Sequence, residues 1–457
     1  MTDLTQQVSP EDDYTAGIGV ALDYDFGKPK KTDFEPWHKP RKQYVRERQW
    51  TQLIDELMTE YIPSDKIVKY LGLPGDDLLD LRYLHDNVCV PKELKIKFLG
   101  FNRGENPGPD HDASLEISRD EISRLPFVDQ QSQLLPDDFV KISSENSMAY
   151  DYSKNMGPFD VINIDLCDSI AKEGVGDFEE NHYNTLNTLM MLQSFRKEPW
   201  LLLLTTRSDK SRVNSEVFEI LKRVYLENLN SCEGFMKKSS TINSVSDEKS
   251  LEAYCSSESG FSNIFLIGLS KWIQALGVDQ TPQKEVEIKS IMGYKVKSRA
   301  NSPDLISIAL QINPTTNLAT DRIGLATHKS ARVNECAKAI AMLEKLSQQV
   351  DVDDLLHNDT SLLDSMIAGS VELLKQARYD VSNYNTWVET KGIFRTHSHD
   401  KLTKEKIVES VEDREKRMAD EKKAEMYSNK ITLSGPKFVE KLDPSQWEKY
   451  DKKRPKK

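Results

Sequence analysis

The stretch Phe159-Asp-Val-Ile-Asn-Ile-Asp165 has the pattern of a buried β-strand that ends in a carboxylate. A second continuous apolar run, Trp200-Leu-Leu-Leu-Leu204, follows it after a segment with helical spacing at 183–195. Continuous apolar strands that alternate with helices are typical of a parallel sheet covered on both faces. These stretches therefore predict an α/β fold.

The same alternation extends in both directions from this pair. A helix is predicted at 76–84, with Asp76 or Asp77 as its cap, and two more at 215–229 and 261–276. The serine-rich segment 231–260 is expected to be an insertion or loop. Further strands are predicted at 66–71, 94–101, 139–142, 290–297 and 304–312, the last two as an antiparallel pair at one edge.

Both ends of the chain differ from this middle. Residues 1–60 combine an acidic start with a basic-aromatic arm at 28–50 and an amphipathic helix. Residues 326–395 show helical periodicity, whereas 396–457 are charged and poor in hydrophobic residues. We therefore expect a Rossmann-like domain at 61–325 between an N-terminal arm and a C-terminal helical appendix with a partly disordered tail.

Composition restricts the class of protein. A net charge of −12 over 457 residues argues against a wholly basic nucleic-acid binder, although it leaves room for a local basic surface. The sequence has no apolar run of about 18 residues and no secretory signal, which argues against a membrane protein. The five cysteines form no C-x-x-C pair and have no histidine at ligand spacing. We therefore expect a cytoplasmic protein without a metal site or disulfides.

Three strand ends carry a resemblance to a known family. Gly72-Leu-Pro-Gly75 follows the first strand, Asn102 follows the second, and Asp165 ends the Phe159–Asp165 strand. With the terminal antiparallel pair, this arrangement resembles the class I S-adenosylmethionine-dependent methyltransferases over about residues 61–325. The resemblance implies a Rossmann-like, mostly parallel sheet that binds S-adenosylmethionine across its carboxyl edge.

The resemblance also implies roles for these residues. Gly72 and Gly75 would let the cofactor approach the backbone beside a helix N-terminus. Asn102 would bind the ribose hydroxyls, where the family usually has an acidic residue. Asp165 would orient the methyl acceptor or the amino end of the cofactor, with Arg207 on the same rim. The alternatives are an ordinary turn at the glycines and a loop or helix cap at Asp165.

Two functions follow from this pattern. The first is a methyltransferase acting on nucleic acid or another large substrate. The second is a catalytically silent, methyltransferase-like scaffold or sensor subunit, for example of a bacterial antiviral defence complex, with protein partners on its helical appendices. The incomplete glycine motif, Asn102 in place of an acid, and the lack of a proline–aromatic pair after Asp165 favour the second.

The basic-aromatic arm at 28–50 offers a candidate partner site. Lysine and arginine neutralise phosphates while aromatic rings stack on bases, so Trp37, Lys39, Arg41 and Lys42 are candidates for binding nucleic acid. The alternatives are packing against the acidic body of the same chain and docking of a protein partner.

Overall fold

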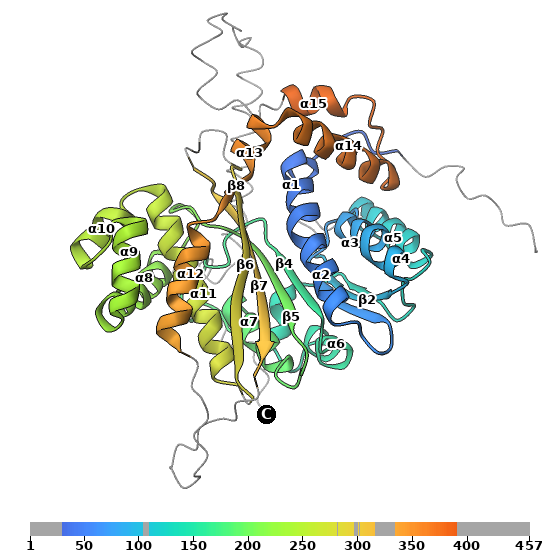
Figure 1. Ribbon diagram of the computed structural model, residues 1–457. Helices are drawn as coiled ribbons and strands as arrows, with labels where there is room; N and C mark the ends of the chain where they lie inside the picture. The colour runs from blue at the N-terminus through green and yellow to red at the C-terminus, as the bar shows by residue number, and fades with distance from the viewer. Residues whose placement is uncertain are drawn as a thin grey trace, which may run out of the picture. The chain divides into compact units, whose positions relative to one another are not determined.

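An eight-stranded sheet runs through the centre of the molecule (Figure 1). The computed structural model describes residues 30–103, 109–280, 282–296, 300, 302–315 and 334–390. The predicted acidic start at 1–25 and the predicted charged tail at 396–457 lie outside the described residues. The strands are β1 Ile67–Gly72, β2 Lys95–Phe101, β3 Gln133–Leu135, β4 Val161–Asp165, β5 Trp200–Arg207, β6 Lys284–Tyr294, β7 Leu305–Pro314 and β8 Val350–Asp351.

The strand order is β3-β2-β1-β4-β5-β7-β6-β8, and within it β7 alone runs against its neighbours. The Rossmann-like, mostly parallel sheet with an antiparallel pair formed by β6 and β7 is therefore confirmed. The chain runs outward from β1 to β3 and then returns to β4 on the other side of β1. The order thus reverses between β1 and β4, which is where open α/β sheets bind ligands.

Alternation along the central strands explains why both faces of the sheet are covered. Successive side chains of a strand point to opposite faces. Ile162 and Leu202 accordingly pack into one hydrophobic cluster, whereas Val161 and Leu203 pack into the other. All four are buried. The continuous apolar runs are therefore the core of the fold.

The helices form a layer on each face. One layer consists of α6 Met148–Met156, α7 His182–Leu192, α8 Ser215–Ser231, α9 Glu233–Asn243, α10 Glu248–Cys255, α11 Glu258–Val278 and α12 Glu335–Leu346. The other consists of α1 Pro40–Val45, η2 Arg46–Thr51, α2 Gln52–Glu60, α3 Leu79–Leu84, η3 His85–Cys89, α5 Pro109–Ser123, α13 Val352–Asn358 and α14 Thr360–Gln376. Shorter elements are η1 Pro36–His38, α4 Val90–Lys92, η4 Phe139–Ser143 and α15 Tyr384–Thr390.

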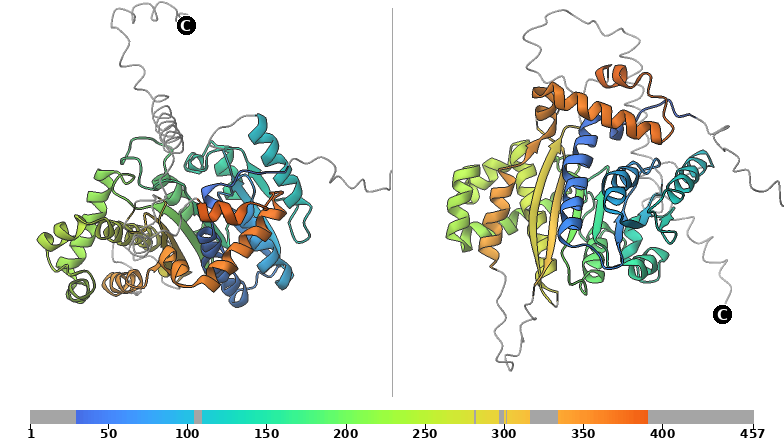
Figure 2. Two further views of the ribbon diagram at one scale, coloured as in Figure 1. Left: turned by 90° about the horizontal axis from the view of Figure 1, so that it is seen from above. Right: turned by 45° about the vertical axis from the view of Figure 1, so that its right-hand side comes forward.

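The two ends of the described chain pack together. Phe34 of the arm lies against Tyr379, Tyr384 and Trp387, with ring centroids 5.8, 5.1 and 5.3 Å apart. Helix α1 contacts α13 and α14, and both views in Figure 2 show the orange helices beside it. The arm is therefore held by C-terminal helices more than 300 residues away in the sequence.

Several local predictions are wrong. Residues 139–142 belong to the 3-10 helix η4, and the third strand is β3. Residues 231–260 form α9, α10 and the start of α11, so this segment is not a loop. Neither Asp76 nor Asp77 caps α3, because the helix follows Leu78, whose φ of 51° is left-handed. The serine-rich composition of 231–260 concealed its buried apolar positions.

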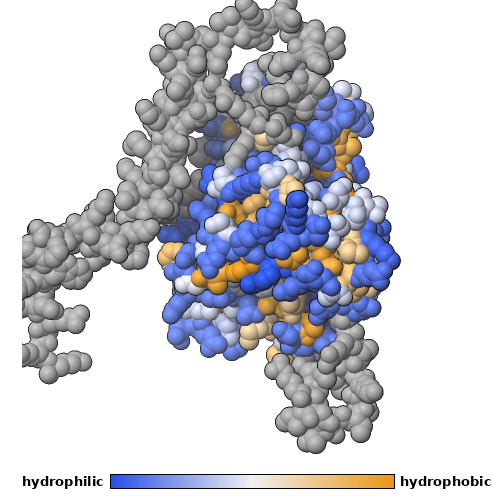
Figure 3. All heavy atoms as spheres, turned by 90° about the vertical axis from the view of Figure 1, so that its left-hand side faces the viewer, coloured by the Kyte–Doolittle hydropathy of each residue, from blue (hydrophilic) through white to orange (hydrophobic). Residues whose placement is uncertain are grey.

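Helix α11 is long and apolar enough to cross a membrane, but its environment is that of a core helix. It packs against α8, α12 and β6, and 67% of its most apolar window is buried. Figure 3 shows the outer face of the molecule on the side of α8–α10 and α12, where hydrophilic residues are interspersed with smaller hydrophobic areas. The hydrophobicity of α11 is thus explained by its packing.

A disulfide joins Cys232, at the start of α9, to Cys336 in α12, with a Cα–Cα distance of 5.8 Å. The expectation that the chain lacks disulfides is therefore wrong. The two cysteines are 104 residues apart, and only the packing of α9 on α12 brings them together.

Candidate functional site

A cleft of about 930 Å³ opens at the carboxyl ends of the parallel strands. Four segments that follow β1, β2, β3 and β4 contribute to its lining: residues 73–80, 101–103, 137–139 and 165–167. The arm, helix α1 and Tyr379 supply most of the remaining wall. The cleft therefore lies where the strand order reverses, and its volume is within the roughly 300–1,000 Å³ of small-molecule sites.

The two glycines of the turn after β1 have different surroundings. A Cβ on Gly72 would lie 2.6 Å from Cε1 of Tyr70, so a side chain there would have to displace the buried Tyr70 ring. Gly72 is also not among the residues that line the cleft. A Cβ on Gly75 would meet no atom within 4 Å, and Gly75 is exposed and lines the cleft. Of the two, Gly75 is the one that offers its backbone to a ligand.

Asn102 holds the turn that follows β1. Its side-chain amide donates hydrogen bonds to the Pro74 carbonyl at 3.1 Å and to Asp76 Oδ1 at 2.9 Å. Asn102, Pro74 and Asp76 all line the cleft. The carboxylate in this part of the cleft is thus supplied by Asp76, and Asn102 fixes its position. A sequence comparison of strand ends cannot detect this, because the two residues belong to different strand–helix turns.

Asp165 lies in the cleft, as expected, and forms an ion pair. Its Oδ1 is 2.5 Å from the ammonium of Lys42, which also lies 4.3 Å from the centre of the Trp50 ring. The side chains of Lys42 and Asp165 are 6% and 20% exposed. Burial lowers the pKa of Lys42, but Asp165 and other acidic neighbours outweigh it, so the pKa lies above its ordinary value. Lys42 therefore contributes a cation, paired with Asp165, to the cleft lining.

A second carboxylate, Asp77, anchors the arm. Lys31 forms an ion pair with it, His38 Nε2 lies 3.4 Å away, and the Tyr379 hydroxyl donates a hydrogen bond of 2.8 Å. His38 Nδ1 accepts the Glu35 backbone N–H, so in a neutral ring Nε2 carries the proton that faces Asp77. Burial would raise the pKa of Asp77, but His38 and Lys31 together lower it to about 2.

The remaining candidates for nucleic-acid binding lie in different places. Trp37 is 40% exposed and lines the cleft. Lys39 lies outside the cleft lining, 6.0 Å from the centre of the Trp387 ring. Arg41 is buried and bonds to Asp353, at 3.1 Å, and to the Lys295 carbonyl. Of the four residues, the structure brings Trp37 and Lys42 into the cleft.

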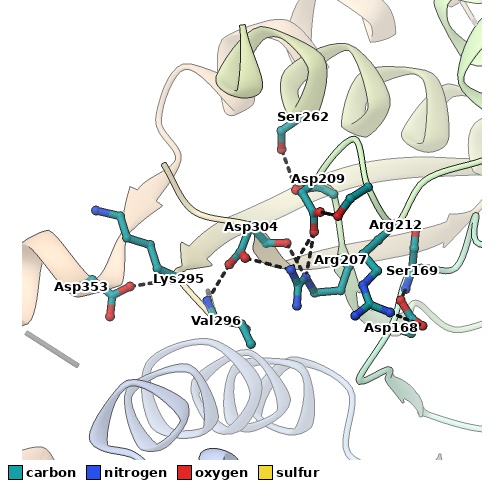
Figure 4. Close-up of polar contacts among 12 residues, drawn as sticks. Asp168, Ser169, Arg207, Asp209, Arg212, Ser262, Lys295, Val296, Asp304 and Asp353 are labelled. Atoms are coloured by element: carbon teal, nitrogen blue, oxygen red, sulfur yellow. Dashed lines mark hydrogen bonds and ion pairs between the residues drawn. The ribbon is translucent and has the colours of Figure 1, made fainter. Parts of the chain in front are cut away.

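Arg207 ends β5, the strand beside β4, but it is buried and is not part of the cleft lining. Figure 4 shows its guanidinium between two buried carboxylates, Asp209 at 2.7 Å and Asp304 at 2.8 Å. Asp304 also accepts the backbone N–H of Val296 at 2.5 Å, which ties the end of β5 to the β6–β7 connection. Arg207 therefore lies at the same carboxyl edge of the sheet as Asp165, as expected, but its side chain does not line the cleft. It is a buried structural cation.

Several cleft residues were not predicted from the sequence, among them Asp137, Asp138 and His182. Asp137 and Asp138 follow β3, which the sequence pattern misplaced. His182 begins α7 and lines the cleft, and burial lowers the pKa of its ring. Within the described ranges, no group of three or more histidine, cysteine or acidic side chains is arranged to hold a metal ion.

Comparisons with known proteins gave one family match and a distant structural similarity. A protein from Listeria monocytogenes, assigned to the class I S-adenosylmethionine-dependent methyltransferases, is similar in structure with a TM-score of 0.32 and 12% sequence identity. The match covers 69% of this chain and 73% of that protein. No curated protein matches the sequence. Residues 31–389 match the PP_RS20740-like family, so the chain belongs to the PP_RS20740-like family.

Proposed function

We propose that this protein is an S-adenosylmethionine-dependent methyltransferase that uses the cleft at the carboxyl edge of β1, β2 and β4. The observation that carries the proposal is the position of this cleft at the reversal of the strand order, with Gly75, Asn102 and Asp165 in its lining. S-adenosylmethionine would supply an electrophilic methyl group. The protein would contribute mainly by binding the cofactor and the acceptor and by orienting them for transfer. Such positioning can account for a large part of the rate enhancement.

The cleft residues fit this cofactor. The open space above Gly75 lets a ligand reach the backbone of the turn. Asp76, fixed by the Asn102 amide, provides a carboxylate for ribose hydroxyls or for an amino group. S-adenosylmethionine carries a net positive charge, and acidic side chains outnumber basic ones in the lining. Asn102 itself would act by positioning Asp76.

The ion pair of Lys42 with Asp165 supports the rival function, a catalytically silent scaffold. A carboxylate that is already neutralised by an internal ammonium binds a further cation less strongly. Binding of S-adenosylmethionine separates the two functions, because a silent scaffold does not need a site that binds the cofactor.

Thermal unfolding with and without S-adenosylmethionine tests the proposal. A ligand that binds the native state alone stabilises it, by about 2.7 kcal/mol at a hundredfold excess over Kd. Gly75→Trp should abolish this shift, because the new ring occupies the cleft without meeting a neighbouring atom at its Cβ. Ile62→Trp, at a 63% exposed site outside the cleft lining, is the matched control and should keep the shift. No shift in the wild type at millimolar cofactor would favour the silent scaffold.

A further inference from the structure

The charge of the cleft distinguishes between classes of methyl acceptor. Eight residues of its lining are acidic and five are basic, an excess of three negative charges. Four of the five basic side chains are already ion-paired with cleft carboxylates. These pairs are Lys31–Asp77, Lys42–Asp165, Arg46–Asp80 and Arg103–Asp138. A polyanion would therefore meet few available cations and several additional carboxylates.

The loop between β4 and α7 extends this acidic character at the mouth of the cleft. Both ends of this loop line the cleft, at Cys167 after β4 and at His182 at the start of α7. The loop therefore borders the cleft, and residues 166–181 contain five acidic side chains and a single lysine. Glu179 and Glu180 of the same loop are exposed. Phosphate groups approaching through this mouth would be repelled.

An exposed indole adds a second feature that suits a cation. Trp37 lines the cleft and is 40% exposed, although a large apolar ring is more stable when covered. The face of an indole binds ammonium groups through the cation–π interaction. The cleft lining already contains such an arrangement, in which the Lys42 ammonium lies between the Asp165 carboxylate and the Trp50 ring. Trp37 and the acidic wall offer a bound ligand the same chemistry.

We propose that the methyl acceptor is a cationic amine, carried by a free polyamine or by a lysine-rich protein segment, and that Trp37 and the acidic mouth bind it. This inference rests on the proposed methyltransferase function. The acceptor ammonium gives one proton to water, and its nitrogen lone pair then bonds to the methyl carbon. The carbon–sulfur bonding pair remains on sulfur, so the cofactor leaves as an uncharged thioether.

Binding of three probes to the full chain tests this inference. Spermidine, a short lysine–glycine peptide and a single-stranded oligonucleotide are titrated at low salt, each with and without S-adenosylmethionine. Either amine should bind more tightly than the oligonucleotide, and a preference between the two identifies the source of the amine. Tighter binding of the oligonucleotide would overturn the inference, as would the absence of amine binding.

Charge-removal variants locate the amine site. Glu179→Gln with Glu180→Gln should weaken amine binding roughly three- to tenfold, since the loss of each exposed charge weakens it about two- to threefold. The control, Glu219→Gln with Glu252→Gln, removes two exposed charges on α8 and α10 and should leave binding unchanged. Equal weakening in both variants would show nonspecific attraction and would overturn the inference.

The cofactor titration separates this inference from the proposed function. If S-adenosylmethionine binds and the amines do not, the acceptor class is wrong while the methyltransferase proposal stands. If the amines bind in a way that depends on Glu179 and Glu180 but the cofactor does not bind, the cleft is an amine site and the methyltransferase proposal fails. Trp37→Ala should lower amine affinity with little change in its salt dependence, because the ring carries no charge.

Discussion

The ion pair between Lys42 and Asp165 joins the N-terminal arm to the cleft, and its strength can be measured by a double-mutant cycle. Removing one partner of a buried pair typically costs 3–5 kcal/mol, because the other charge stays behind without compensation. Asp165 is 20% exposed, so water relieves part of this cost when Lys42 is replaced. We therefore expect Lys42→Met to lower the free energy of unfolding by about 3 kcal/mol.

Asp165→Asn should cost slightly more, about 4 kcal/mol, because it leaves the more deeply buried Lys42 ammonium beside the Trp50 ring without its ion-pair partner. The double variant removes both charges, so it should cost about 4 kcal/mol, no more than Asp165→Asn alone. The expected coupling energy is therefore about 3 kcal/mol, at the upper end of the range for residues in direct contact.

Urea unfolding at pH 7, followed by circular dichroism, gives the four free energies. The pair Lys237–Glu233 is a matched control, because its atoms are 2.6 Å apart but its side chains are 69% and 74% exposed. Its coupling should stay below about 1 kcal/mol. If the coupling energy of Lys42 with Asp165 is no larger than that of this surface pair, then these two residues do not form a buried ion pair in the cleft.

Three further predictions follow from buried or covalent features. Asp77 has a pKa of about 2, below its ordinary value of 3.8. Its carboxylate should therefore add about 2 kcal/mol to the free energy of unfolding above pH 4, and this contribution should be lost as the pH falls through 2. Asp77→Asn should therefore flatten the acid limb of stability against pH, and an unchanged limb would contradict this. Reducing the disulfide between Cys232 and Cys336 should lower the free energy of unfolding by up to about 4.7 kcal/mol, because the bond closes a loop of about 100 residues. Equal urea midpoints with and without reductant would contradict this. Cys167 is exposed and should be alkylated in the native protein. Cys89 is buried, which raises its pKa to about 12, so it should react only after unfolding. Detection of alkylated Cys89 by mass spectrometry of the native protein would refute this.

The strands were predictable because their apolar side chains report burial directly. The runs around Val161 and Leu201 are continuous since helices cover both faces of the sheet, and such patterns depend only on neighbours in the sequence. The segment 231–260 was not predictable, because its helices bury only a few residues such as Phe235 and Leu251 among many serines.

The candidate site was predictable in its position but not in its partners. A carboxylate at the end of β4 had to lie at the carboxyl edge of the sheet, so Asp165 could be placed there from the sequence. Its pairing with Lys42, 123 residues away, follows from the way α1 packs on the sheet. The contact between Asn102 and Asp76 likewise depends on the shape of two turns. The sequence pattern therefore indicates where the site lies, but neither all of its residues nor which of them neutralise each other.

A calorimetric titration of the full chain with S-adenosylmethionine tests the central claim most directly, because it requires neither a known acceptor nor turnover. The account predicts a saturable heat corresponding to one cofactor per chain, lost in Gly75→Trp and retained in Ile62→Trp. No measurable binding to folded wild-type protein at millimolar cofactor would contradict it, and the cleft would then not be a site for S-adenosylmethionine.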